Sequence, residues 1–76
     1  MMSELLGRRL RALRRLKRFT QQDLAEKIGI SVSMLSNIER GSKYPRVELI
    51  KKIAKMLDVT LEELFVLPES LQERSS

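Results

Sequence analysis

The sequence predicts a compact all-α domain of five helices. Apolar residues recur at helical spacing along most of the chain, residues typical of helix starts and stops divide that pattern, and no segment alternates in the manner of a strand. A chain of 76 residues has room for one small core. We expect a single domain over residues 1–67 and a short polar tail over residues 68–76.

The first helix is expected over residues 4–17. Ser3 is a candidate N-cap, and Leu6, Leu10 and Leu13 repeat at helical spacing. The opposite side of the same helix is basic and carries Arg8, Arg11, Arg15 and Arg18. A solvated face is the usual role of any one such arginine, although their number favours contacts from some of them to a polyanion.

The second and third helices are expected to form a pair over residues 20–41. Thr20 with Asp23 fits a capping box, Gly29 fits a left-handed helix end, Ser31 fits the next N-cap, and Gly41 fits the next stop. The apolar residues that join the pair are Leu24, Ala25, Ile28, Ile30, Leu35 and Ile38. They leave a short, mostly polar and uncharged face: Gln21, Ser31, Val32, Ser33, Ser36 and Asn37. Such a face suits contact with base edges in a DNA groove.

The fourth and fifth helices complete the predicted core. Pro45 stands near the start of the fourth helix, whose apolar stripe is Val47, Ile50, Ile53, Ala54 and Leu57. Asp58 follows, and aspartate tolerates the left-handed conformation of a helix end. Thr60 with Glu63 predicts a capping box for a helix over residues 61–66, which Pro68 stops.

The composition favours a nucleic-acid partner over catalysis. The formal net charge is +5 and the pI is about 10.1, and basic residues crowd the first 19 positions. The chain has no cysteine and no histidine, and Glu62 and Glu63 diverge as neighbours on a short helix. We therefore expect no enzyme, cofactor, metal site or membrane insertion, and we expect a cytoplasmic location.

Several spaced elements together resemble the XRE-type (Cro/C1-type) helix-turn-helix DNA-binding family of phage repressors. They are Leu6-Gly7, Leu10-Arg11, Leu13-Arg14, Phe19-Thr20-Gln21, Leu24-Ala25, Gly29-Ile30-Ser31, Leu35-Ser36, Ile38-Glu39-Arg40-Gly41, Pro45, Ile53-Ala54, Leu57 and Leu64. The resemblance implies a five-helix lambda-repressor-like domain whose third helix enters the major groove of double-stranded DNA.

The resemblance also implies roles for individual side chains. The positions that match base-reading residues are Val32, Ser33 and Asn37. Val32 would contact a thymine methyl group, and the amide of Asn37 would pair with adenine. The positions that match backbone or rim contacts are Gln21, Ser31, Ser36, Arg40, Ser42, Lys43 and Tyr44. Gln21 would hold a phosphate, against the alternative of a solvated helix start, and Tyr44 would either contact phosphate or pack on its loop.

Arg14 and Glu39 match a pair that joins the first and third helices of family members as a partly buried ion pair. Two positions depart from the family pattern. Arg18 stands where a glycine is common, which predicts strain if the turn needs a positive φ. Arg46 stands where a serine cap is common, which leaves the start of the fourth helix open.

The predicted function is a transcriptional regulator, a repressor that binds a palindromic operator as a homodimer. A dimer must use the domain itself, and the candidate contacts are Leu61, Leu64, Phe65 and Val66, part of which the core needs. The alternative is an antitoxin, controller or adaptor whose main role is to bind a protein partner of unknown identity. Membrane binding by the first helix is disfavoured, because the core requires its leucines.

Overall fold

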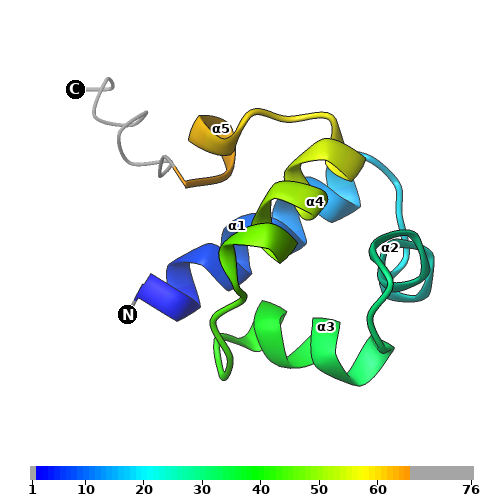
Figure 1. The fold of residues 1–76 in the computed structure, drawn as a ribbon, viewed down its shortest axis with the longest axis horizontal. Helices are drawn as coiled ribbons and strands as arrows, with labels where there is room; N and C mark the ends of the chain where they lie inside the picture. Colours follow the sequence, from blue (N-terminus) through cyan, green and yellow to red (C-terminus); the bar gives the residue numbers. More distant parts are fainter. Residues whose placement is uncertain (1, 66–76) are drawn as a thin grey trace.

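The computed structural model describes the backbone of residues 2–65 and the side chains of residues 4–65. These residues form five helices and no strand: α1 (Met2–Leu16), α2 (Gln21–Ile28), α3 (Val32–Arg40), α4 (Val47–Leu57) and α5 (Leu61–Phe65). The five-helix, all-α class predicted from the sequence is confirmed. Figure 1 shows α3 at the edge of the molecule opposite α5, with α2 beside it.

One hydrophobic core joins all five helices. Leu24, Leu35, Ile38 and Leu57 are completely buried in it. The buried apolar set is Leu6, Leu10, Leu13, Leu24, Ala25, Ile28, Leu35, Ile38, Ile50, Ile53, Ala54, Leu57 and Leu64. The predicted apolar stripes therefore face the interior, except that Ile30 is only partly buried and Val47 is exposed.

The predicted ends of α2 and α3 are confirmed. Thr20 Oγ1 accepts a hydrogen bond from the Asp23 backbone N–H at 2.9 Å, and the Asp23 carboxylate accepts one from the Thr20 N–H at 3.2 Å. Ser31 Oγ accepts from the Met34 N–H at 3.0 Å. Gly29 and Gly41 adopt left-handed φ values of 77° and 84°, which suit glycine because it has no Cβ.

The start of α1 differs from the prediction. The helix begins at Met2, so Ser3 lies in its first turn rather than at the N-cap, and the helix ends at Leu16. Leu16 itself is exposed.

The ends of α4 and α5 follow the sequence more closely. Arg46 precedes α4 without a side-chain capping bond, whereas Asp58 closes that helix with a left-handed φ of 59°. Thr60 and Glu63 form the predicted capping box, with both hydrogen bonds at 2.9 Å. α5 ends at Phe65, and the predicted last helical residue, Pro68 and the tail lie outside the described residues.

The turn between α1 and α2 requires a left-handed residue, and that residue is Arg18, with φ 65°. The strain anticipated for a side chain at this position is therefore present. A left-handed conformation costs a residue other than glycine roughly 1–2 kcal/mol. The turn is held by hydrogen bonds from the Arg18 N–H to the Arg15 carbonyl and from the Phe19 N–H to the Arg14 carbonyl, both at 3.0 Å.

Candidate nucleic-acid interface

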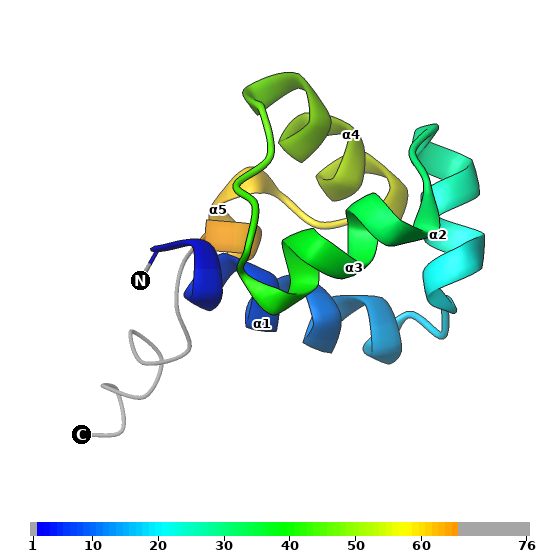
Figure 2. The ribbon, with the colours of Figure 1, turned by 90° about the horizontal axis from the view of Figure 1, so that it is seen from below.

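The outer face of α3 is open to solvent. Figure 2, the view from below, shows α3 in front, with α1 and α4 on either side and no other described helix covering it. The capping residue Ser31 and the first turn, Val32 and Ser33, are exposed, and Val32 exposes 42% of its surface. Ser36 and Asn37 are half-buried. The three positions predicted to contact bases therefore lie at the surface of one helix.

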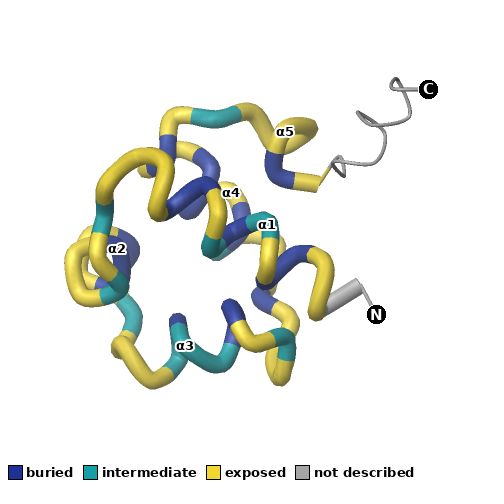
Figure 3. Tube along the Cα trace, turned by 180° about the vertical axis from the view of Figure 1, so that it is seen from behind, coloured by how far each residue is buried: buried dark blue, intermediate teal, exposed yellow. Residues whose placement is uncertain are grey.

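The inner face of the same helix is buried. Leu35 and Ile38 expose none of their surface, and Glu39 exposes 2%. Figure 3 shows the buried residues of α3 alternating with its less buried ones. Because the two faces belong to one helix, contacts made by the inner face fix the direction in which the outer face points.

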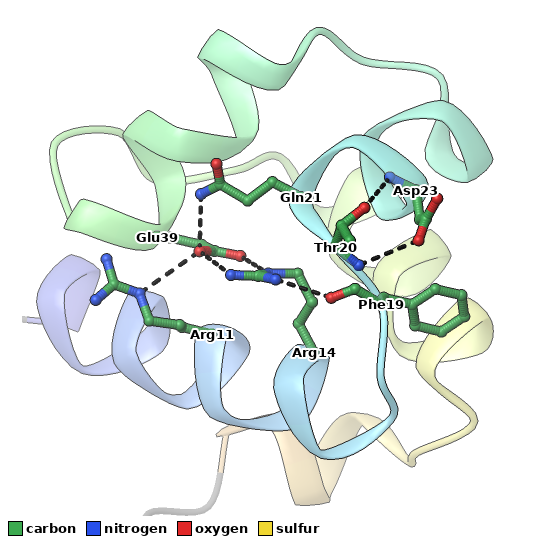
Figure 4. A network of polar contacts seen from close by, with 7 residues as sticks. All are labelled: Arg11, Arg14, Phe19, Thr20, Gln21, Asp23 and Glu39. Atoms are coloured by element: carbon green, nitrogen blue, oxygen red, sulfur yellow. Dashed lines mark hydrogen bonds and ion pairs between the residues drawn. The ribbon is translucent and has the colours of Figure 1, made fainter.

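The strongest of these inner contacts is a buried ion pair between α1 and α3. Arg14 Nε donates to Glu39 Oε2 at 2.6 Å, and Arg14 Nη2 donates to Glu39 Oε1 at 3.1 Å (Figure 4). Arg14 Nη1 donates to the Phe19 carbonyl at 2.8 Å, so the same guanidinium also holds the turn before α2. Such two-point pairing is the strong geometry of arginine with a carboxylate.

Glu39 also receives contacts from two further side chains. Gln21 Nε2 donates to Glu39 Oε1 at 3.0 Å, and Arg11 Nε lies 3.6 Å from the same oxygen (Figure 4). One carboxylate thus ties α3 to both α1 and α2. Gln21 uses one amide N–H in this bond and keeps a second one, so the phosphate contact assigned to it stays a prediction.

Sequence reasoning missed the role of Gly7. A Cβ atom at this position would lie 2.5 Å from the carbonyl oxygens of both Ile38 and Glu39. Glycine therefore lets α1 approach the backbone of α3 closely. Its position inside an otherwise continuous helical pattern was the available signal, since glycine weakens a helix interior unless packing requires it.

The rim residues lie in the loop after α3. Ser42, Lys43 and Tyr44 are all exposed, as a contact with a DNA backbone requires. Ser42 Oγ donates to the Asn37 backbone carbonyl at 3.3 Å, so this bond joins the loop to the last turn of α3. Tyr44 exposes 45% of its surface and lines a pocket of about 410 Å³ together with Met34 and Leu49. Both alternatives for Tyr44 therefore remain compatible with its position.

Arg40 turns back along the outer face of α3. Its Nη1 donates to Ser36 Oγ at 3.0 Å, and its Nη2 donates to Asn37 Oδ1. This contact between a predicted rim residue and a predicted base-reading residue was not expected from the sequence. Residues three and four positions apart on a helix are neighbours, which was the only signal for it.

The basic face of α1 is partly engaged within the molecule. Arg9 Nε donates to the Glu63 carbonyl at 3.0 Å and connects α1 to α5, while Arg11 faces Glu39. Arg8 and Arg15 are exposed, and so is Arg18, which lies in the turn after α1 and not on the helix itself. The charge of this helix thus serves the fold at some positions and faces solvent at others.

The predicted dimer contacts also include both exposed and buried residues. Leu61 and Phe65 expose 39% and 38% of their surfaces. Leu64 exposes only 1% because it packs into the core, so it belongs to the part of this candidate set that the core needs. Val66 lies outside the described residues.

Within residues 2–65, no helix is long and apolar enough to cross a bilayer. Nor does the described part of the chain gather three or more acidic side chains into a group that could hold a metal ion.

Residues 10–64 match the helix-turn-helix family model, which covers most of the chain and all of the interface described above. The chain belongs to the XRE-type helix-turn-helix family. Members of this family are DNA-binding transcriptional regulators, which agrees with an exposed polar face on α3.

Relatives in this helix-turn-helix family include one protein of similar length and one that is longer. The uncharacterised transcriptional regulator YazB of Bacillus subtilis is 45% identical over 64 residues, which are 84% of this chain and 93% of YazB. The regulator SinR of the same species is 34% identical over 79% of this chain and 55% of SinR.

Solved structures of this family have the same arrangement of helices. The restriction-modification controller protein C.AhdI of Aeromonas hydrophila is 38% identical, with a TM-score of 0.76 over 79% of this chain and 87% of C.AhdI. The clp gene regulator ClgR of Corynebacterium glutamicum is 28% identical, with a TM-score of 0.88 over 99% of this chain and 80% of ClgR.

Proposed function

We propose that this regulator is a repressor that binds a palindromic operator as a homodimer and inserts α3 into the major groove. Val32, Ser33 and Asn37 contact base edges. Gln21, Ser31, Ser36, Arg40, Ser42, Lys43 and Tyr44 contact the DNA backbone or the rim of the groove. The observation that carries this proposal is the uncovered outer face of a helix whose inner face is tied to α1 and α2 through Glu39.

Rigid placement matters because base contacts depend on geometry. A side chain that discriminates between bases must present its donors and acceptors at the groove edge in a fixed register. The bonds from Arg14 and Gln21 to Glu39 link three helices around α3. They hold α3 in place before DNA arrives, so little ordering of the helix is needed on binding.

The dimer follows from the small number of side chains that one α3 offers. At about 1–3 kcal/mol for each good base contact, one protomer discriminates weakly among genomic sites. Two protomers on half-sites about one helical turn apart add their contributions. Exposed Leu61 and Phe65 supply apolar surface for the contact between protomers.

The test is selection of bound duplexes from a random pool, followed by measurement of affinity against salt. A palindromic motif with half-sites about 10 base pairs apart supports the proposal. With 6–10 phosphate contacts per dimer, affinity should fall about 10³–10⁵-fold between 50 and 200 mM salt. A flat salt response with no enriched motif would contradict DNA recognition, and a single unpaired half-site with a monomer mass at micromolar protein would contradict the dimer.

A second candidate function is control of a neighbouring operon together with a protein partner. The similarity to the restriction-modification controller protein C.AhdI favours the controller form of this alternative. Selected motifs that map upstream of a restriction-modification operon would support it. Motifs that map to unrelated promoters would contradict it.

A further inference from the structure

Three side chains on the outer face of α3 form a hydrogen-bonded unit, Ser36–Asn37–Arg40. The Arg40 guanidinium donates from Nη1 to Ser36 Oγ at 3.0 Å and from Nη2 to Asn37 Oδ1. The backbone beneath this unit is also fixed, because the Asn37 carbonyl accepts a hydrogen bond from the Ser42 N–H at 2.9 Å. The side-chain amide of Asn37 is therefore held by Arg40, on a backbone position that the loop after α3 also fixes.

The chemistry of arginine decides which way the Asn37 amide points. A guanidinium has five N–H donors and no acceptor, so the amide atom that faces it must be the oxygen. The NH₂ group of Asn37 then points away from Arg40. A base N–H that approached the same oxygen would meet the positive charge of Arg40 beside it.

The unit as a whole consequently offers donors. Asn37 presents its NH₂ group, and Arg40 keeps three of its five N–H groups after the two bonds within the unit. In the major groove, guanine presents two acceptors, N7 and O6. Adenine presents one acceptor, N7, and one donor, the N6 amino group.

We propose that the Ser36–Asn37–Arg40 unit selects guanine at the base that Asn37 contacts. The proposal rests on the proposed function, because it requires α3 to lie in the major groove. It replaces the adenine preference expected for an asparagine amide alone, since the Asn37 oxygen that would accept from N6 already accepts from Arg40 and lies beside its positive charge. Arg40 thereby acts as a specificity-determining residue and not only as a rim contact.

The Asn37→Ala variant identifies the base that Asn37 contacts. It is the position in the selected motif at which this variant loses its base preference. The unmodified protein should favour guanine over adenine there by about tenfold or more. Arg40→Ala should shift the preference at this one position toward adenine, because it frees the Asn37 oxygen. Ser36→Ala, which removes the second anchor of the guanidinium, should shift it in the same direction by a smaller factor.

Affinities are measured at 50 mM salt, where loss of one charge leaves binding detectable, and Lys43→Ala serves as a charge-matched control. Lys43→Ala should weaken all duplexes alike and keep guanine at the defined position. If the unmodified protein selects any base other than guanine there, or if Arg40→Ala leaves the preference unchanged, the guanine proposal is overturned while DNA recognition stands. If the unmodified protein enriches no sequence, the proposed function itself fails.

Discussion

The two faces of α3 differ in how tightly the rest of the molecule holds them. On the inner face, Glu39 exposes 2% of its surface and is bonded by Arg14 and Gln21 from two other helices. On the outer face, Val32 exposes 42% of its surface, and the side-chain contacts of Asn37 stay within α3. The comparison separates two kinds of residue: inner residues should control stability, and outer residues should control DNA recognition.

The largest effect should come from Glu39→Ala on the inner face. The change leaves the buried Arg14 guanidinium without its partner, and loss of one member of a buried pair costs about 3–5 kcal/mol. The free energy of unfolding is measured by urea denaturation followed by circular dichroism. Glu26→Ala, at an exposed position on α2, is the control and should change stability by less than about 0.5 kcal/mol. Equal stability of the two variants would remove the distinction between the faces.

A second inner-face change is Gly7→Ala. Its Cβ would lie 2.5 Å from two carbonyl oxygens of α3, so α1 and the backbone of α3 must move apart. We expect a loss of about 1–3 kcal/mol in the free energy of unfolding, as for overpacking elsewhere. The loss should appear although alanine is intrinsically the better helix former by about 1 kcal/mol.

Ala12→Gly, at an exposed position of α1, is the matched control for Gly7→Ala, because it reports helix propensity without the close approach. It should destabilise by about 1 kcal/mol. If Gly7→Ala instead stabilises the protein by that amount, the contact between α1 and α3 is looser than the structure shows.

On the outer face, Asn37→Ala should leave stability almost unchanged, within about 0.5 kcal/mol. It should remove about 1–3 kcal/mol of discrimination at one base position per half-site. Fluorescence anisotropy with the selected duplex and its single-base variants measures this loss. A large drop in melting temperature, with unchanged base preference, would place Asn37 with the inner residues.

The smallest effect should come from Lys43→Ala in the loop after α3. Its exposed charge is expected to contact phosphate, so the variant should bind all sequences more weakly and equally. The slope of log affinity against log salt should fall by about 1 for each Lys43 lost. Selective loss of affinity for one duplex would show instead that Lys43 contacts a base.

The helix ends were predictable from the sequence because they depend on neighbouring residues. Each signal bonds or shapes the backbone within a few positions of its own residue. The examples are the capping boxes Thr20–Asp23 and Thr60–Glu63 and the left-handed Gly29. Ser3 failed as a cap because the helical pattern continues to Met2, where no local signal marks a start.

Contacts between helices were less predictable, because they depend on where the helices cross. The sequence alone does not show that Gly7 meets the backbone of α3 or that Gln21 faces Glu39. The pairing of Arg14 with Glu39 was expected only through resemblance to a family. The sequence also left open which of the candidate dimer residues the core needs, and the structure shows that Leu64 is buried.

The most direct test of DNA recognition by the outer face is backbone amide chemical-shift mapping with the selected duplex. The largest changes should fall on residues 31–37 and on the loop of residues 42–44. Lys51 and Lys55 on α4, which are exposed but lie outside the proposed interface, should change little. Unmoved α3 amides together with large changes around Lys51 and Lys55 would contradict the placement of α3 in the groove.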